Sequence, residues 1–407
     1  MPVNVELPAA VVVPGVTLSA CAAGIKANGT TDMVLFSLVE GSTTVGVFTQ
    51  NTFCAAPVTV AKAHLAEQTK GAVRALLVNS GNANAGTGKP GIDVAQKHCS
   101  TLSEQLNCEA NQVLPYSTGV IGEQLPDAKM QAALPMLVES LDGSLAAWEQ
   151  AARGIMTTDT VPKLTSKTLT IKGEAVTITG MSKGAGMIEP NMATMLAYVF
   201  TDAKVSKNDL QRALDVSVAQ SFNSITVDSD TSTNDACMLS ATGLSAELAE
   251  GDADWAEFQS ALDEVLLLLA QAIVRDAEGA TKFITADVAG GASVADCRAI
   301  GYGICNSPLV KTAMFASDAN VGRLLMAIGK VGIEKLDPYQ VKVMVNDLAV
   351  FENGLLHPDY SEAKGSAVMQ ASDITVSIDL GMGEYGASIY TSDLSHDYVT
   401  INAEYRT

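Results

Sequence analysis

Positively charged side chains are scarce in this sequence of 407 residues. Lysine and arginine number 25 against 45 aspartates and glutamates, which gives a formal net charge of −20. Because nucleic-acid binding relies on lysine and arginine to neutralise phosphates, this balance argues against a nucleic-acid partner. It argues equally against an acidic membrane surface. An anionic small molecule stays open as a ligand, but the protein must then supply a local cation for it.

The sequence also has few histidines and no regularly spaced cysteine motif. The chain has four histidines and seven cysteines. No CxxC pair, HExxH motif or mixed cluster is present, so a metal centre has little support. An odd number of scattered cysteines favours a reduced, cytoplasmic protein with unbridged thiols. A Ser–His–Asp triad stays open, although no GxSxG segment is present to carry it.

Long apolar runs and intact phosphate-binding loops are missing as well. No uncharged apolar run has the length of a membrane-spanning helix. NSGNANAGTGKPG (79–91) has Ala83 where a P-loop needs glycine, and Pro90 where it needs serine or threonine. GAGMIE (184–189) has Glu189 in place of the third glycine of a dinucleotide fingerprint. We therefore expect no tightly bound cofactor.

The chain does have enough apolar residues for a large core, with 47% hydrophobic and 17% charged residues. Its length allows two or three domains. The expected helices are 91–107, 125–141 with an interruption at Pro135, 208–225, and 254–279 with Asp254 as N-cap. The expected strands are 41–50, 72–81, a hairpin over 167–180 that turns at 172–173, and 374–381, 386–394 and 398–405. This order predicts a mixed α/β fold, with a soft boundary near 280–290 before a strand-rich C-terminal domain, 290–407.

Thr194 stands immediately before a continuous apolar run, residues 195–200, which is typical of a strand buried on both faces. The ordinary interpretation is a β-branched residue at the start of a strand. The alternative is a nucleophile, because small side chains flank the bond after Ala193, and Lys183 and a glycine-rich stretch come shortly before. A cut at that bond would free an α-amine with a pKa near about 7.7–8.0, which could replace histidine as the base.

Long segments of the sequence, in matching order, carry a family resemblance over essentially the whole chain. They are VFTQNTFCAAPV (47–58), NSGNANAGTG (79–88), TGVIGEQLP (118–126), MTTDTVPK (156–163), KGAGMIEPNMATML (183–196), RDAEGATKF (275–283) and NAEYRT (402–407). Together they closely resemble the ArgJ family, the ornithine acetyltransferases of arginine biosynthesis.

The resemblance implies a DmpA/ArgJ-like fold of β-sheets sandwiched by helices. It implies self-cleavage between Ala193 and Thr194 into an α chain, 1–193, and a β chain, 194–407. Thr194 would carry acetyl from N-acetylornithine to glutamate in a ping-pong reaction, with acetyl-CoA as a further donor in some members. A heterotetramer of two α and two β chains is also implied.

The resemblance assigns the oxyanion hole to Thr118 and Gly119. A glycine N–H can approach a developing oxyanion without a side chain in the way, and a threonine hydroxyl adds a second donor. Taken alone, Ser-Thr-Gly is more often a plain turn.

The resemblance assigns substrate binding to Thr157, Lys183, Glu278, Asn402 and Thr407, together with the nucleophile. A lysine is the cation that an acidic protein must supply for a carboxylate substrate, although an exposed loop lysine is the ordinary interpretation. The last two positions lie in the predicted final strand and the tail, which the family folds into the active site. Thr407 stands where either serine or threonine is expected.

Glu278 has a physical argument of its own. Asp276 and Glu278 crowd the C-terminal end of the predicted helix 254–279, where acids oppose the helix dipole at a cost of about 0.3–1 kcal/mol each. The side-chain ammonium of ornithine would offset that cost. The alternative is a solvated glutamate just past the helix.

Two other functions stay open at this point. An amidohydrolase or aminopeptidase would use the same nucleophile, with water replacing glutamate as acceptor. A small-molecule binding protein would never cleave its own chain.

Overall fold

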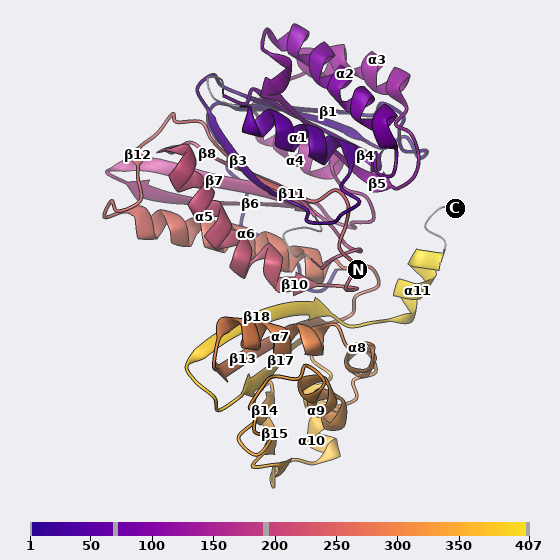
Figure 1. Ribbon diagram of the computed structural model, residues 1–407, viewed down its shortest axis with the longest axis vertical. Coiled ribbons are helices and arrows are strands. Elements are labelled where there is room, and N and C mark those ends of the chain that lie inside the picture. Colours follow the sequence, from indigo (N-terminus) through magenta and orange to yellow (C-terminus); the bar gives the residue numbers. More distant parts are fainter. Residues whose placement is uncertain (1, 68–71, 190–194, 404–407) are drawn as a thin grey trace.

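Two stacked sheets with helices on their outer sides form the larger, upper lobe in Figure 1. One sheet with its helices forms the lower lobe, which consists of residues 283–392 and a two-residue strand at 225–226. The computed structural model describes residues 2–67, 72–189 and 195–403. Within them the strands form sheets of four, five, seven and two strands. No helix in these ranges has both the length and the apolar character needed to cross a membrane.

The four-stranded sheet is the outer of the two sheets in the upper lobe. Its order is β1 (Val16–Cys21), β2 (Met33–Leu38), β4 (Ala75–Asn82) and β5 (Val113–Val120). Side chains alternate across a strand, and β4 shows this clearly, because Leu76 and Val78 face the second sheet while Ala75 and Leu77 face helices. The helices of this half are α1 (Ala56–Ala66), α2 (Gly88–Leu106), α3 (Asp127–Glu139) and α4 (Leu145–Gly154).

The five-stranded sheet lies against the first and contains the apolar run that follows Thr194. Its order is β3 (Thr43–Phe48), β11 (Ala236–Ala241), β8 (Leu196–Thr201), β7 (Glu174–Lys183) and β6 (Lys163–Ile171). In β8, Tyr198 and Phe200 face the first sheet, whereas Ala197 and Val199 face helices. The strand is buried on both faces, as the sequence predicted.

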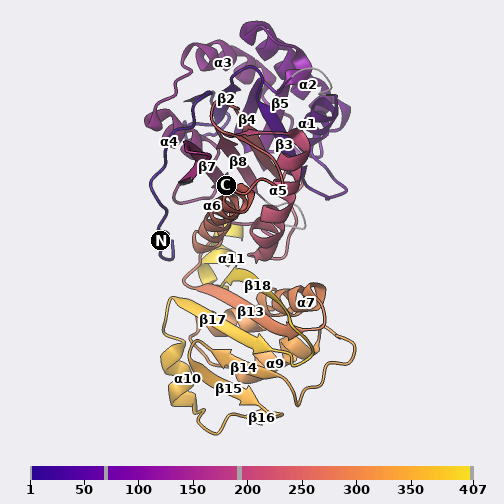
Figure 2. The same ribbon diagram turned by 90° about the vertical axis from the view of Figure 1, so that its left-hand side faces the viewer.

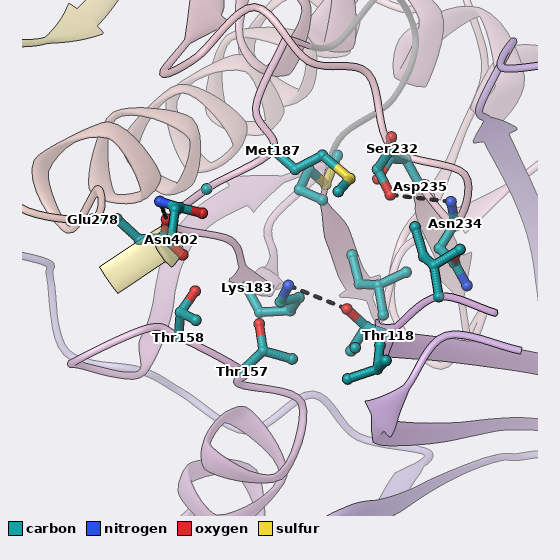
Figure 3. A pocket seen from close by; sticks show the side chains of 16 residues that line it. Thr118, Thr157, Thr158, Lys183, Met187, Ser232, Asn234, Asp235, Glu278 and Asn402 are labelled. Atoms are coloured by element: carbon teal, nitrogen blue, oxygen red, sulfur yellow. Dashed lines mark hydrogen bonds between the residues drawn. The ribbon is translucent and has the colours of Figure 1, made fainter. Parts of the chain in front are cut away.

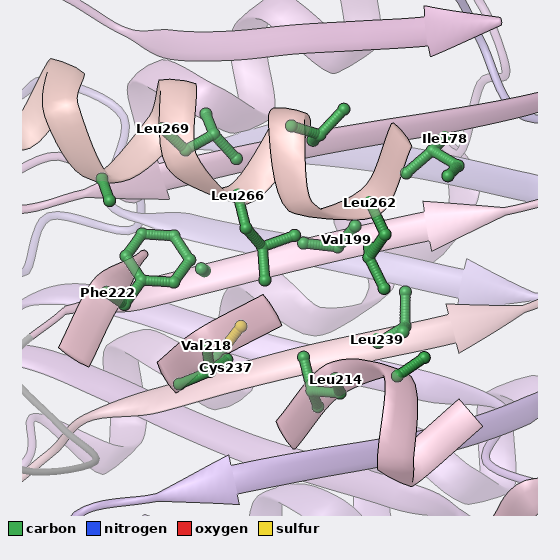
Figure 4. Close-up of a cluster of buried hydrophobic side chains, with 14 of the residues drawn as sticks. Ile178, Val199, Leu214, Val218, Phe222, Cys237, Leu239, Leu262, Leu266 and Leu269 are labelled. Carbon is green, nitrogen blue, oxygen red and sulfur yellow. The ribbon is translucent and has the colours of Figure 1, made fainter. Parts of the chain in front are cut away.

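Helices α5 (Lys207–Gln220) and α6 (Trp255–Arg275) cover the other side of this sheet. Figure 4 shows Leu262, Leu266 and Leu269 of α6 over the strands. Full burial of each such side chain contributes about 1.5–3 kcal/mol. Asp254 occupies the predicted N-cap position, but its side chain does not cap α6 and instead accepts the backbone N–H of Lys172 in the β6–β7 turn at 2.9 Å.

The lower lobe is built on the seven-stranded sheet, which Figure 2 shows below the two stacked sheets. Its order is β10 (Ile225–Thr226), β18 (Tyr385–Ser392), β13 (Phe283–Gly291), β17 (Asp373–Asp379), β14 (Lys342–Val345), β15 (Leu348–Glu352) and β16 (Leu355–Leu356). Its helices are α7 (Val294–Cys305), α8 (Pro308–Phe315), α9 (Val321–Gly329) and α10 (Glu362–Val368). The boundary near 280–290 stays a prediction.

Short elements complete the described chain. They are the β9 (Lys204–Val205) and β12 (Glu247–Leu248) pair and the 3-10 helices η1 (Ala110–Gln112) and η2 (Phe222–Ser224). The hairpin predicted over 167–180 is present, and its turn at Lys172 and Gly173 has positive φ angles of 51° and 86°.

Two local predictions were wrong. Residues 398–405 were expected to form a strand, but helix α11 spans His396–Ala403, and the Ser395 hydroxyl accepts the backbone N–H of Tyr398 at its start. No residue of α11 is buried, so the alternation of its β-branched residues does not form the face of a sheet. Pro135 was expected to interrupt a helix, but it lies inside α3, where burial of Leu134 and Leu137 outweighs the lost backbone hydrogen bond.

Candidate active site

A cavity of about 250 Å³ lies where β5, β7, β8 and β11 meet the segments before β6 and after α6 (Figure 3). Its wall includes six of the residues that the resemblance singled out, Thr118, Gly119, Thr157, Lys183, Glu278 and Asn402. These residues come from distant parts of the chain. The fold therefore brings them together in one place.

Thr118 and Gly119 lie at the end of β5. A Cβ atom on Gly119 would lie 2.3 Å from the carbonyl carbon of Gly81 on β4, and the φ angle of Gly119 is 133°. Close contact between the two strands therefore requires glycine here, a reason that the sequence alone did not supply. The Thr118 hydroxyl accepts a hydrogen bond from Lys183 Nζ at 3.2 Å, which leaves its own O–H available to a ligand.

Lys183 is the last residue of β7 and not an exposed loop lysine. It is 8% exposed. Burial lowers the pKa of the Lys183 ammonium, and the Asp159 carboxylate acts in the opposite direction. Lys183 pairs with Leu196 across β7 and β8, so the cavity's cation lies opposite a position two residues after Thr194.

Asp159 ties two walls of the cavity together. One of its oxygens accepts the backbone N–H of Gly184 at 2.7 Å, and the other accepts that of Thr157 at 3.0 Å. Lys163 forms ion pairs of 2.7 Å with Asp159 and with Asp276, and all three side chains are almost fully buried. The charge of Asp276 at the end of α6 is therefore offset by Lys163 and not by a ligand.

Glu278 lies on the opposite side of the cavity from Asn234 and Asp235 in Figure 3, with Lys183 between them. Its carboxylate accepts a hydrogen bond from Asn402 Nδ2 at 2.7 Å. A Cβ atom on Gly186 would lie 2.4 Å from Glu278 Oε2, so only glycine leaves room for the carboxylate there.

Helix α11 makes a second hydrogen bond at the edge of the cavity, in addition to the one between Asn402 and Glu278. The Tyr398 hydroxyl donates to Asp228 Oδ2 at 3.1 Å. Asp228 also accepts the backbone N–H groups of Met187 and Ile188, each at 2.7 Å. The helix therefore contacts the loop that follows β7 as well as Glu278.

Three predicted residues, Ala193, Thr194 and Thr407, lie outside the described residues. Met195, the residue after Thr194, lines the cavity.

Sequence analysis missed several cavity residues. Ser232, Asn234 and Asp235 precede β11 and line the wall opposite Glu278. Asn234 Nδ2 donates to the carbonyls of Ala83 at 2.6 Å and Ser117 at 2.9 Å. The one available signal was the run of polar residues just before an apolar strand, which by itself is also typical of a turn.

Comparison with known proteins identifies the family. The model of the ArgJ family matches residues 17–407. The chain belongs to the ArgJ family.

Two ArgJ relatives match the chain over almost all of its length. Both are called arginine biosynthesis bifunctional protein ArgJ. The one from Pseudomonas fluorescens (strain Pf0-1) is 51% identical over 97% of either chain. The one from Methylococcus capsulatus is also 51% identical, over 97% of this chain and 96% of its own.

A solved structure is similar as well. It is arginine biosynthesis bifunctional protein ArgJ from Bacillus halodurans, with 37% identity and a TM-score of 0.50. The match covers 99% of that chain but 52% of this one.

Proposed function

We propose that this ArgJ protein moves acetyl from N2-acetyl-L-ornithine to L-glutamate in arginine biosynthesis, through an acetyl ester on Thr194. The observation that carries the proposal is the cavity beside Met195, which combines a buried cation, Lys183, with an acid, Glu278. Acetylornithine carries an α-carboxylate and a side-chain ammonium, so it can pair with both. Family membership supports the same activity.

The first step is self-cleavage. The Thr194 hydroxyl attacks the carbonyl carbon of Ala193, the peptide bond breaks, and water opens the resulting ester. The tetrahedral intermediate carries a negative oxygen, for which Thr118 and Gly119 are the proposed donors. Loss of one such donor typically lowers the rate by about 10²–10³.

The second step uses the new terminus. The α-amine of Thr194 takes the hydroxyl proton, and the oxygen attacks the acetyl group of acetylornithine. Ornithine leaves, and the amine of glutamate then accepts the acetyl group. Thr157, Asn402 and Thr407 are the further proposed contacts to substrate.

Both predicted chains are needed for this cavity. Thr118 and Lys183 belong to 1–193, whereas Asp235 and Glu278 belong to 194–407. Strands β7 and β8 pair across the predicted cut, so the two pieces share one sheet. We propose that they stay associated, as a cytoplasmic heterotetramer of two α and two β chains. The solved Bacillus halodurans chain matches 52% of this one, and a division of this chain into two pieces of similar length would be consistent with that share.

No dedicated cofactor is proposed. Acetyl-CoA is the proposed second acetyl donor, which fits the word bifunctional in the names of the relatives. Formation of acetylglutamate from acetyl-CoA and glutamate, without acetylornithine, tests this part. An enzyme that needs acetylornithine under all conditions would contradict it.

The central experiment combines gel electrophoresis and mass spectrometry. Wild-type protein should run as two bands under denaturing conditions, and Thr194→Ala should run as one and lack transfer activity. Ser232→Ala leaves the residues at the cut unchanged and removes a different hydroxyl of the cavity wall, so it is the control and should still yield two bands. Protein quenched after acetylornithine addition should carry one acetyl group on Thr194, and an adduct on any other side chain would refute the mechanism.

The amidohydrolase alternative predicts a different dependence on glutamate. A transferase stops after one acetylation per site when glutamate is withheld. A hydrolase continues to release acetate. Measuring ornithine release over many turnovers without glutamate separates the two.

A further inference from the structure

Thr158 belongs to the cavity wall, but the family resemblance gave it no role. Its side chain is half-buried, and its hydroxyl has no hydrogen-bond partner among the described residues. Within the described chain, Thr158 and Glu278 are the two residues that line both this cavity and a neighbouring one of about 550 Å³, which α11 also lines. Thr158 therefore belongs to the end of the site where Glu278 lies.

Two buried carboxylates hold the backbone on either side of Thr158. Asp159 accepts the N–H of Thr157 at 3.0 Å, and Asp276 accepts the N–H of Thr160 at 2.9 Å. Both carboxylates belong to the buried ion pairs described above. The backbone of this segment is thereby fixed, while the hydroxyl of Thr158 stays available to a ligand. Recognition groups on such a rigid support keep a precise position.

The two adjacent threonines lie toward different ends of the cavity. In Figure 3, Thr157 lies just below Lys183, whereas Thr158 lies on the side of Glu278 and Asn402, with its hydroxyl oxygen directed toward them. The neighbouring cavity agrees with this view, because Thr158 lines it and Thr157 does not. A substrate whose α-carboxylate pairs with Lys183 would thus extend its side chain toward Thr158.

This end of the site has to accept two side chains of opposite charge in turn. Acetylornithine brings an ammonium group there, and glutamate brings a carboxylate. Glu278 attracts the first and repels the second. The cavity wall formed by the described residues has no cation other than Lys183, which the α-carboxylate occupies. The side-chain carboxylate of glutamate therefore needs a neutral hydrogen-bond donor.

The other neutral side-chain donors of this wall are occupied or lie elsewhere. Asn402 Nδ2 donates to Glu278 at 2.7 Å and to a backbone carbonyl of its own helix at 3.0 Å, so both of its protons are used. Asn234 Nδ2 likewise donates to two backbone carbonyls. Ser232 lies on the wall opposite Glu278. At the Glu278 end, the available side-chain donor is the hydroxyl of Thr158.

We propose that Thr158 is a specificity-determining residue that lets one site take both side chains. Its hydroxyl donates to the side-chain carboxylate of glutamate and accepts a hydrogen bond from the side-chain ammonium of acetylornithine. A hydroxyl group has one donor and two acceptor lone pairs and rotates to suit its partner, whereas a fixed charge serves only one of the two ligands. The inference rests on the proposed function, since it concerns the two substrates of that reaction.

Thr158→Val is the test variant, because it keeps the shape of the side chain and removes the hydroxyl. Thr158→Ser keeps the hydroxyl and is the rescue variant. Thr170→Val is the matched control, since Thr170 is an exposed residue of β6 outside the cavity wall. The measurement is kcat/KM for acetylornithine and for glutamate separately, because in a ping-pong reaction each value reports its own half-reaction.

We expect Thr158→Val to lower kcat/KM for glutamate by about 10–100-fold, because the carboxylate loses a charge-assisted hydrogen bond next to Glu278. The loss for acetylornithine should be about tenfold or less, because its ammonium keeps the Glu278 carboxylate. Thr158→Ser should stay close to wild type for both substrates, and Thr170→Val should equal wild type.

A second variant, Thr158→Ala, keeps the test decisive if valine disturbs the cavity wall, and it should show the same preference for acetylornithine over glutamate. Equal losses for the two substrates, an unchanged value for glutamate, or a failure of Thr158→Ser to restore it overturns the role of Thr158 alone. A wild-type enzyme that moves no acetyl from acetylornithine to glutamate overturns the proposed function as well.

Discussion

Lys183 and Glu278 place opposite charges in one small cavity, and the two proposed substrates differ in how they use them. Acetylornithine has a side-chain ammonium for Glu278, whereas glutamate has a side-chain carboxylate. Glu278→Gln should therefore lower kcat/KM for acetylornithine by about 10–100-fold, since hydrogen bonds to charged groups contribute about 1.5–3 kcal/mol. The kcat/KM for glutamate should stay level or rise.

Separate kinetics for the two half-reactions check this prediction. Glu123→Gln, an exposed residue outside the cavity wall, is the control and should change neither value. Equal losses for both substrates in Glu278→Gln would mean that Glu278 does not recognise the ammonium.

Asp159 is expected to contribute to stability as well as to the shape of the site. Asp159→Asn removes one partner of a buried ion pair, which should lower the free energy of unfolding by about 3–5 kcal/mol. Asp93→Asn is the control, because its ion pair with Lys89 has the same 2.7 Å length but is exposed, and it should lose at most about 1 kcal/mol. Melting temperatures measured by circular dichroism compare the two, and equal effects would contradict the prediction.

The Asp159 carboxyl group should also make the stability of the protein depend on pH. Burial alone would raise the pKa of the Asp159 carboxyl, but Lys163, Lys183 and the N–H of Gly184 hold it well below its usual range. The stabilisation is therefore complete above the ordinary aspartate pKa of about 3.9 and is lost as pH falls below it. Between about pH 4 and pH 2 the melting temperature of wild type should fall more steeply than that of Asp159→Asn. If the melting temperatures of wild type and Asp159→Asn fell in parallel with pH, Asp159 would not be the source of the pH dependence.

The roles of single residues could be predicted from the sequence only where a sequence motif contained them. The matching segments located Thr118, Lys183 and Glu278, which the fold then brings into one cavity. Asp159 and Asp235 received no role, because burial and a shared ion pair depend on residues far away in sequence. The helix-dipole argument for Asp276 failed for the same reason, since Lys163 lies more than a hundred residues before it.

At the level of secondary structure, predictability followed the depth of burial. The run that becomes β8 and the hairpin of β6 and β7 were predicted, because strong apolar patterning and a glycine turn act locally. Helix α11 was mistaken for a strand. It has no buried face, so its apolar residues say little about its conformation.

Helix α11 is expected to matter for activity but not for stability. Asn402 donates to Glu278, and no residue of the helix is buried. Truncation after Ser395 should lower kcat/KM for acetylornithine by at least about tenfold and leave the melting temperature unchanged. Kinetics and thermal melting of the truncated protein test both halves of the statement.

A point variant narrows this effect to one contact. Asn402→Ala should reproduce most of the loss, whereas Val399→Ala, whose side chain is 62% exposed on the same helix, should behave as wild type. A truncated enzyme with full activity would remove α11 from the site.

For the molecule as a whole, the net charge of −20 should slow the arrival of anions. Glutamate is a net anion, whereas acetylornithine is a neutral zwitterion. Salt screens the repulsion, so kcat/KM for glutamate should rise, by less than about tenfold, between low and physiological ionic strength. The value for acetylornithine should change little. Stopped assays at several salt concentrations provide the comparison, and a fall for glutamate would indicate that the local field of Lys183 prevails.

The two-residue strand β10 belongs by chain order to the upper lobe but pairs in parallel with β18 of the lower sheet. A fragment that begins at Phe283 would lack β10, so β18 would become an edge strand. Its unpaired backbone N–H and C=O groups could then pair with a strand of another molecule. Any attempt to produce the C-terminal part separately invites aggregation unless the excised piece starts upstream of Ile225.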